Sequence, residues 1–160
     1  MAKRYKVLVG GEWTGDDRPG IEVVNPYDGS VIGVVPEATN EDVDRAIHAA
    51  QAGFAEMAAL PAHRRSDILE RTSELITRDR EEIAEIIARE AGKSWKFALA
   101  EADRSAETFR FASLEARNAH GELVPMDASP VSAGVFGLDI RTPICGGGVV
   151  APLIIPLIFV

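Results

Sequence analysis

The feature that most restricts how this sequence can fold is the order of its strand-like and helix-like segments along the chain. Residues 3–38 are rich in β-branched residues and punctuated by glycine, residues 39–119 carry apolar residues at helical spacing, and residues 121–143 are extended again. A doubly wound α/β domain alternates strands with helices, and too few strands follow the helices here to close such a sheet. We therefore expect an α/β chain that resembles the opening part of a larger protein.

The first segment predicts three strands joined by tight turns. The β-branched runs are Tyr5–Val9, Ile21–Val24 and Ser30–Val35. Gly10-Gly11 is expected to turn the chain after the first run. Asp28-Gly29 is expected to form a hairpin turn before the third, because both residues tolerate positive φ.

The first helix of the middle segment is expected to begin after Thr39. A threonine before Glu41-Asp42 is typical of an N-cap followed by acidic residues in the first turn. Apolar residues then recur at helical spacing and predict one apolar side: Val43, Ile47, Ala50, Phe54 and Met57.

Two further helical stretches follow. Pro61 is expected to take the first position of the second stretch, which the polar residues Arg78–Arg80 interrupt. Gly92 is expected to form a left-handed cap at its end. The last stretch runs from about Trp95 to Asn118. Its buried stripe is expected to include Phe97, Ala100, Phe111 and Leu114.

The third segment predicts two strands. Glu122–Pro125 is a short apolar strand, and Val135–Thr142 alternates well enough to form another before Pro143 ends it. Asp127–Gly134 between them is expected to form a loop.

Composition excludes several classes of function. Asp and Glu outnumber Lys and Arg by 25 to 17, and no clustered basic face marks a nucleic-acid binder. Cys145 is the single cysteine, so no internal disulfide forms. The charge-free residues Val149–Val160 are too few to span a bilayer and contain Pro152 and Pro156. We expect a soluble cytoplasmic protein without a nucleic-acid or membrane partner.

The glycine run Gly146–Gly148 has two interpretations. A phosphate-binding loop would need a lysine and a serine or threonine after the glycines, and neither is present. A flexible turn is therefore the favoured interpretation.

Cys145 also has two interpretations. A nucleophilic thiol needs a base or a positive field, and none of His48, His63 and His120 is near it in sequence. A buried, inert cysteine is favoured. The histidine spacing and the lack of a Cys-x-x-Cys pair do not suggest a metal site. Glu101 has no evident partner and is interpreted as a surface or structural residue.

Several short runs resemble the NAD(P)-dependent aldehyde dehydrogenase superfamily, and their order and spacing agree from Lys6 to Ile144. The stretch Glu122–Pro130 is most similar to the lactaldehyde or phosphonate-aldehyde branch. The runs that carry the resemblance are Gly10–Trp13, Val24–Gly29, Val31–Gly33, Glu41–Ala46, Arg64–Leu69, Glu90–Lys93 and Ile140–Ile144.

The resemblance implies the fold, the reaction and a division into parts. Members oxidise an aldehyde to a carboxylate with NAD or NADP on a Rossmann-like sheet, in subunits much longer than this chain. Residues 1–120 would be the outer hairpin and helices of the cofactor-binding domain. Residues 121–143 would be strands of the oligomerisation arm. Residues 144–160 would be a divergent apolar tail at the start of an incomplete cofactor site.

The resemblance also implies that this chain alone is inactive. Pro152, Leu153 and Ile154 fall in the family's cofactor region, and Ile154 stands where the family has its catalytic asparagine. Losing one such donor to the oxyanion costs about a hundred- to thousandfold in rate. The family's catalytic cysteine and glutamate are absent, and Cys145 aligns with a family glycine. A frameshift, a degraded gene or a deliberate alteration of the sequence would each produce such a truncated chain.

Three functions remain open at this point. The chain is a catalytically silent dehydrogenase fragment, a noncatalytic module that pairs with full-length subunits through Phe136–Thr142, or an independent enzyme that uses Cys145. Helices that lack their sheet leave apolar surface exposed, so we expect marginal stability or self-association.

Overall fold

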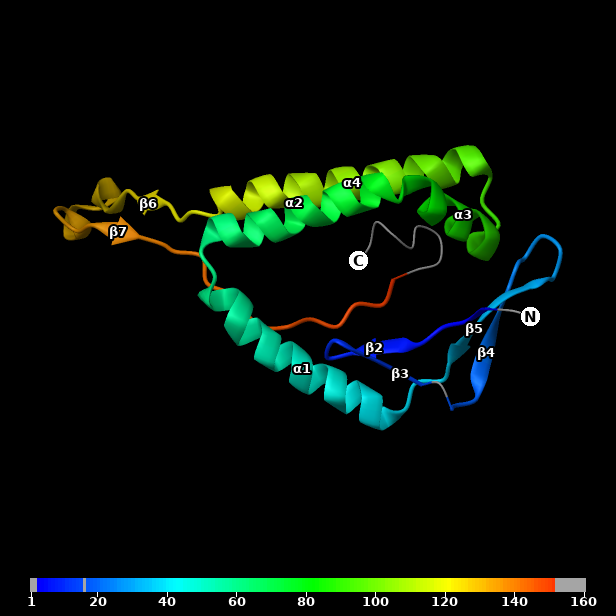
Figure 1. Ribbon diagram of the computed structural model, residues 1–160. Coiled ribbons are helices and arrows are strands. Elements are labelled where there is room, and N and C mark those ends of the chain that lie inside the picture. The colour runs from blue at the N-terminus through cyan, green and yellow to red at the C-terminus, as the bar shows by residue number, and fades with distance from the viewer. Residues whose placement is uncertain (1–2, 16, 152–160) are drawn as a thin grey trace.

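The computed structural model describes residues 3–15 and 17–151 (Figure 1). It confirms the expected α/β class, with four helices and small sheets. The elements are β1 Lys3–Arg4, β2 Val7–Val9, β3 Glu12–Thr14, β4 Gly20–Val24, β5 Val31–Pro36, α1 Asn40–Ala59, α2 Ala62–Arg78, α3 Arg80–Ala91, α4 Trp95–Asn118, β6 Leu123–Val124 and β7 Gly137–Leu138, with 3-10 turns at Met126–Ala128 and Pro130–Ser132.

The amino-terminal strands form two sheets. β4 and β5 pair in antiparallel fashion, β1 joins β5 in parallel, and β2 and β3 form a separate hairpin over Gly10 and Gly11. The expected single strand Tyr5–Val9 was wrong, because the chain passes from one sheet to the other at Tyr5 and Lys6. The Tyr5 amide still donates to the Val34 carbonyl at 2.9 Å. β-branched runs predict strands but not which strands pair.

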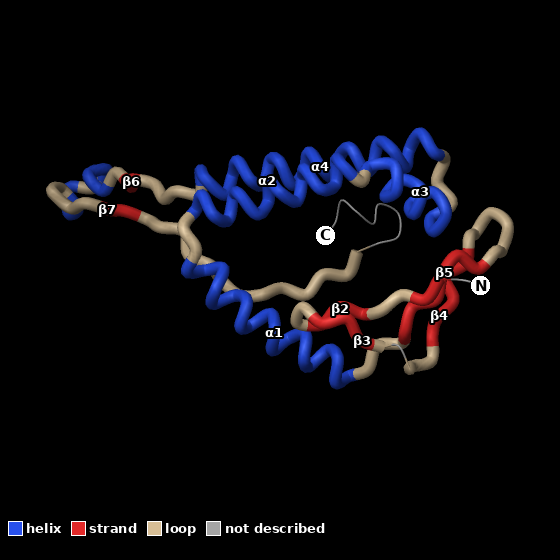
Figure 2. Tube along the Cα trace, in the orientation of Figure 1, coloured by secondary structure: helices blue, strands red, loops and turns tan. Residues whose placement is uncertain are grey.

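Small side chains join α2 to α4, which lie side by side along their length (Figure 2). Ser73 Oγ donates to the Ala106 carbonyl at 2.7 Å and ties the two helices together. Side chains this small allow the helix backbones to approach closely. The buried residues of the two helices, apart from Ala98 and Glu101, are Ser66, Ser73, Ala102, Ser105, Ala106 and Ser113.

The buried stripe expected on α4 was wrong. Phe97 and Phe111 are each 67% exposed and Leu114 is 51% exposed. The helical spacing of large apolar residues shows that they share one side of α4, but it does not show which side of α4 packs against the neighbouring helices. Here alanine and serine occupy the packed side.

Helix α3 packs against α4 around a small apolar cluster of Ala84, Ile87 and Ala98. Gly92 follows α3 with φ of +64°, which confirms the expected left-handed cap. Ser94 precedes α4, whose bounds agree with those expected. Pro61 precedes α2 rather than opening it, since α2 begins at Ala62.

A capping box and an ion pair hold the start of α1. The Thr39 hydroxyl accepts from the Asp42 amide at 3.2 Å, and the Asp42 carboxylate accepts from the Thr39 amide at 2.9 Å. Arg18 donates both guanidinium nitrogens to the same carboxylate, which is buried. These contacts confirm Thr39 as the cap and join α1 to the loop before β4.

Replacing Asp42 with asparagine should remove an acid-sensitive part of the stability. The hydrogen bonds from Arg18 and from the Thr39 amide hold the pKa of Asp42 well below its usual range. A depressed folded-state pKa stabilises the fold above the unfolded value of about 4, and this contribution is lost as the pH falls further. Urea unfolding of the two proteins at several pH values should therefore differ most near neutrality and converge in acid. A constant difference between pH 7 and pH 3 would contradict this assignment.

An extended arm projects from the end of the α2–α4 pair (Figure 1). β6 and β7 pair through Leu123 with Leu138 and through Val124 with Gly137. The expected strand Val135–Thr142 was wrong outside Gly137–Leu138, because only these two residues form ladder bonds with β6. In the described residues, no helix is long and apolar enough to cross a membrane.

Candidate functional site

The residues expected to lie in a cofactor site are outside the described part of the chain. These are Pro152, Leu153 and Ile154. The glycine run before them, Gly146–Gly148, is described and forms no turn, contrary to the favoured interpretation. A Cβ atom added at Gly147 or Gly148 would meet nothing within 4 Å. No other described part of the chain therefore lies close to these two glycines.

Cys145 is exposed, so its expected burial was wrong. It lies in residues 143–151, which carry no regular secondary structure and are all exposed, so a small apolar side chain finds no core there. Within the described ranges no hydrogen bond or ion pair joins Cys145 to another residue. No described residue supplies the bonded base or cation that an activated thiol requires.

The three histidines come from different segments: His48 from α1, His63 from α2 and His120 from the loop after α4. The ring of His48 contacts the Asp44 carbonyl of its own helix at 2.7 Å, and His63 is exposed near the start of α2. Among the described residues, no group of three or more His, Cys, Asp or Glu side chains could hold a metal ion.

The structure pairs Glu101 with Lys93, which sequence reasoning missed. The Glu101 side chain is 4% exposed and accepts from Lys93 Nζ, whose side chain is 23% exposed. Lys93 follows the Gly92 cap, so the pair joins the α3–α4 corner to the buried side of α4. Of the two roles expected for Glu101, surface or structural, the structure supports the structural one. The spacing of eight residues across a loop gives no helical signal that would reveal the pair.

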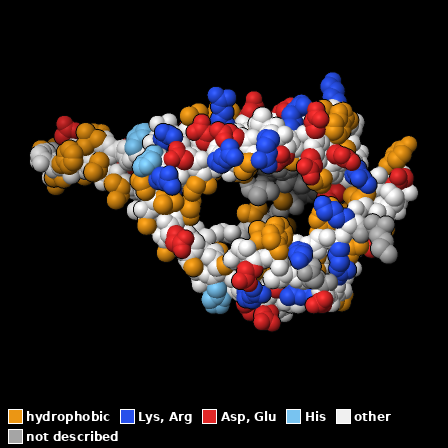
Figure 3. Space-filling model, in the orientation of Figure 1, with side chains coloured by type: hydrophobic (Ala, Val, Ile, Leu, Met, Phe, Trp, Pro, Cys, Tyr) orange, Lys and Arg blue, Asp and Glu red, His pale blue; other side chains and the backbone are white. Residues whose placement is uncertain are grey.

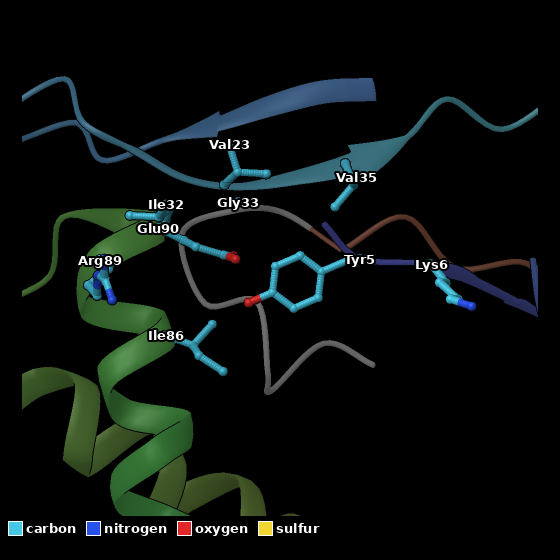
Figure 4. A pocket seen from close by; sticks show the side chains of 9 residues that line it. All are labelled: Tyr5, Lys6, Val23, Ile32, Gly33, Val35, Ile86, Arg89 and Glu90. Atoms are coloured by element: carbon cyan, nitrogen blue, oxygen red, sulfur yellow. The ribbon is translucent and has the colours of Figure 1, made fainter. Parts of the chain in front are cut away.

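A cavity of about 330 Å³ lies between the β4–β5 sheet and the carboxyl end of α3 (Figure 4). The Tyr5 ring projects into it beside Gly33, where an added Cβ would lie 2.7 Å from a ring carbon. The residues of β4 and β5 that line it are apolar, and its charged lining residues are Lys6 and, from α3, Arg89 and Glu90. The lining residues are Tyr5, Lys6, Val23, Ile32, Gly33, Val35, Ile86, Arg89 and Glu90. None of the residues expected to carry chemistry lies there.

Comparison with known proteins identifies the family. The sequence model of the aldehyde dehydrogenase family matches residues 13–160. This chain belongs to the aldehyde dehydrogenase family. The match continues to Val160, although the short runs that carried the resemblance end at Ile144.

Named dehydrogenases match most of this chain over a limited share of their own length. The chain is 38% identical over 126 residues to aspartate-semialdehyde dehydrogenase 1 of Pseudomonas canavaninivorans, covering 79% of this chain and 27% of that protein. Aldehyde dehydrogenase 21 from Physcomitrella patens, solved with the product succinate, superposes with a TM-score of 0.80 at 35% identity, covering 86% of this chain and 29% of that one. The aldehyde dehydrogenase chain described here thus spans less than a third of these relatives' length.

Lactaldehyde dehydrogenases and users of both expected cofactors occur among the matching proteins. Lactaldehyde dehydrogenase from Escherichia coli superposes with a TM-score of 0.73 at 30% identity, covering 79% of this chain and 27% of that one. Matching structures are described as an NAD-dependent benzaldehyde dehydrogenase from Corynebacterium glutamicum and an NADP-dependent enzyme from E. coli. Both cofactors therefore occur among the aldehyde dehydrogenases that this chain resembles.

Proposed function

We propose that this chain is the amino-terminal portion of an NAD(P)-dependent dehydrogenase that oxidises an aldehyde to a carboxylate, and that the 160 residues alone are inactive. The observation that carries the proposal is the family match over residues 13–160 in a chain that spans 27% and 32% of two curated relatives. In this role residues 1–120 supply the outer hairpin and helices of the cofactor domain, and residues 121–143 supply the arm.

The state of the reacting groups supports inactivity. Cys145, the single thiol, is exposed and lacks a base or cation bonded to it in the described part. Ile154 replaces the asparagine that would donate to the oxyanion, and isoleucine has no donor. Pro152 and Leu153 fall at the sequence positions of the family's cofactor region, and no described residue packs closely over Gly147 and Gly148 just before them. An oxyanion without a preorganised donor is poorly stabilised, so turnover is not expected.

The test of this proposal is formation of NAD(P)H. The purified chain is incubated with NAD or NADP and a panel of short-chain aldehydes and semialdehydes, and the absorbance of the reduced cofactor is followed. Aspartate-semialdehyde dehydrogenase 1 of P. canavaninivorans serves as the positive control. We expect no rate above the protein-free background. Turnover of any aldehyde at a rate comparable with the control would overturn the proposal.

A second candidate function is pairing with full-length dehydrogenase subunits through the arm. The observation that favours it is the open apolar surface of β6–β7, where Leu123, Phe136, Leu138 and Ile140 are 64%, 77%, 65% and 72% exposed. A two-stranded sheet with unpaired edges is a template for further strands. It leaves the chain noncatalytic, as the first proposal does.

Pull-down of a full-length relative by the tagged chain tests this pairing. Leu138→Asp should abolish capture, because Leu138 lies in β7 and a charge at the strand edge opposes pairing with an apolar edge. Val131→Asp is the matched control, since Val131 lies in the arm on a 3-10 turn rather than in a strand. Equal loss in both variants, or no capture by the unmodified chain, would exclude the arm as a pairing surface.

A further inference from the structure

The turn between β4 and β5 carries the only Asp-Gly or Asn-Gly pair of the sequence, Asp28-Gly29. Residues 26–30 are exposed, and Figure 3 shows the turn as a protrusion at the right-hand edge of the molecule. Gly29 has φ of +72°, and a Cβ added there would meet nothing within 4 Å. Glycine has no side chain to shield its own amide nitrogen. The Asp28 carboxyl group thus lies next to an unshielded backbone amide.

An aspartate followed by glycine can rearrange without an enzyme. The glycine amide nitrogen attacks the side-chain carboxyl carbon: a C–N bond forms, the nitrogen loses its proton, and one carboxyl oxygen leaves as water. Water then adds to a carbonyl of the cyclic imide and breaks one of its C–N bonds, which gives either aspartate or isoaspartate. One water is released and one is consumed, so the composition is unchanged. Isoaspartate adds the side-chain methylene to the backbone.

Hydrogen bonds in the folded turn hold both reacting groups of this pair. The nitrogen must release its proton, yet the Gly29 amide donates that proton to the Asn25 carbonyl at 2.9 Å. The carboxyl carbon must approach that nitrogen, yet Asp28 Oδ1 accepts from the Ser30 amide at 3.0 Å and from the Ser30 hydroxyl at 2.7 Å. Aspartate in turns commonly bonds the backbone two residues on in this way. The nucleophile and the electrophile are therefore both engaged with other partners.

The charge of the Asp28 carboxylate is a further obstacle to the reaction. The Ser30 hydroxyl, the Ser30 amide and, more weakly, the charge of Arg89 hold the pKa of Asp28 below its usual range. Hydrogen bonds to the charged form stabilise that form. The neutral acid is the reactive form, because it loses water, whereas a carboxylate would have to lose oxide. Ser30 thus reduces the fraction of Asp28 that is able to react.

We propose that Asp28-Gly29 is a site of spontaneous isoaspartate formation, and that hydrogen bonds within the folded turn, above all those from Ser30, keep it unreactive. The co-reactant is water. Isoaspartate then forms only in chains whose turn has opened, because opening frees the amide and the carboxyl group together. The modification is a chemical mark of opening at this end of the β4–β5 sheet.

Isoaspartate in this turn would also hinder closure of the sheet. The added methylene lengthens the connection between Val24 and Val31, which pair across β4 and β5. A Cβ added at Gly92 would lie 2.9 Å from the Pro26 ring, so the turn packs against the α3–α4 corner. A backbone with one more atom no longer matches both contacts. Since β5 also holds β1, the modification would turn a transient opening of the sheet into a lasting one.

A comparison of the folded and unfolded chain tests the site. The full chain is incubated at mildly acidic pH and constant temperature, once folded and once unfolded in urea, and is then digested with trypsin. Asp28 falls in the peptide of residues 7–45, in which electron-transfer fragmentation distinguishes isoaspartate from aspartate at each position. We expect isoaspartate at Asp28 to form at least about tenfold more slowly in the folded chain, because hydrogen bonds to a charged group and to the amide must break first.

Two variants test the role of Ser30. Ser30→Ala removes the hydroxyl donor and should raise the rate in the folded chain by about tenfold, since one charge-assisted hydrogen bond is lost. Ser30→Thr is the matched control, because it keeps the hydroxyl, and its rate should stay close to that of the unmodified chain. In urea the three chains should react alike, since none of these hydrogen bonds persists there.

The proposal is overturned by any of three outcomes. They are equal rates in the folded and the unfolded chain, no isoaspartate at Asp28 in the unfolded chain, and equal rates for Ser30→Ala and Ser30→Thr in the folded chain. The first comparison needs no variant, so it holds even if a substitution disturbs folding. All three are measured at Asp28 itself and do not depend on whether the chain forms NAD(P)H.

Discussion

Replacing Ser105 with leucine is expected to push α2 away from α4 and to destabilise the helical part of the chain strongly. Ser105 is fully buried on the side of α4 that carries small residues, one residue before the carbonyl that accepts from Ser73. Inserting three extra carbons into a close-packed interface costs about 3 kcal/mol. That is a large fraction of the total stability of about 5–15 kcal/mol typical of a folded domain. Urea unfolding followed by circular dichroism measures the change.

Ser105→Ala is the matched control for this prediction. The Ser105 hydroxyl donates to the Glu101 carbonyl of its own helix at 2.9 Å, a bond that contributes little to stability. Alanine fits the same space, so the control should stay within about 1 kcal/mol of the unmodified chain. If leucine proves as harmless as alanine, α2 and α4 do not pack as closely in solution as the structure shows.

Replacing Lys93 with methionine is expected to destabilise the α3–α4 corner by about 2 kcal/mol. Glu101 would stay buried and lose the ammonium that donates to it. Removing one partner of a fully buried ion pair costs about 3–5 kcal/mol. The smaller value applies here because the Lys93 side chain remains 23% exposed. The urea midpoint of the helical transition reports the loss.

A second substitution and a surface control separate charge from packing. Adding Glu101→Gln to Lys93→Met removes the buried charge and should recover much of the lost stability. Lys96→Met removes an exposed lysine three residues later and should change the stability by less than about 0.5 kcal/mol. Failure of Glu101→Gln to recover stability would show that Lys93 acts through its aliphatic stem rather than through its charge.

Local signals predicted much of the secondary structure. Thr39 before two acids, Gly92 at a helix end and the run from Trp95 to Asn118 each gave a boundary that the structure confirms. These signals involve residues within one or two turns of each other, where capping and periodicity act. They also sufficed to indicate that the chain is an open α/β piece.

Contacts between distant residues were beyond sequence reasoning. The burial of Ser66 and Ser105 in place of Phe97 and Phe111 depends on which side of α4 faces α2. The exposure of Cys145 depends on the absence of a core around the extended segment that carries it. Recognition of the family came from the order of many short runs, since no single run is specific. The proposed site residues, Pro152 to Ile154, remain predictions.

The parallel pairing of β1 with β5 fixes an order of events during synthesis. Lys3 leaves the ribosome before its partner Gly33 and the neighbouring Val34, which follow some thirty residues later in the chain. β1 therefore stays unpaired until β5 has been synthesised, whereas the β2–β3 hairpin can close as soon as its own residues emerge. The α2–α4 contact waits longer, because Arg117 reaches back to Ser66 across α3. The nascent chain can thus pair β1 to β5 before it forms the α2–α4 contact, and β1 is held in place by a strand synthesised after it.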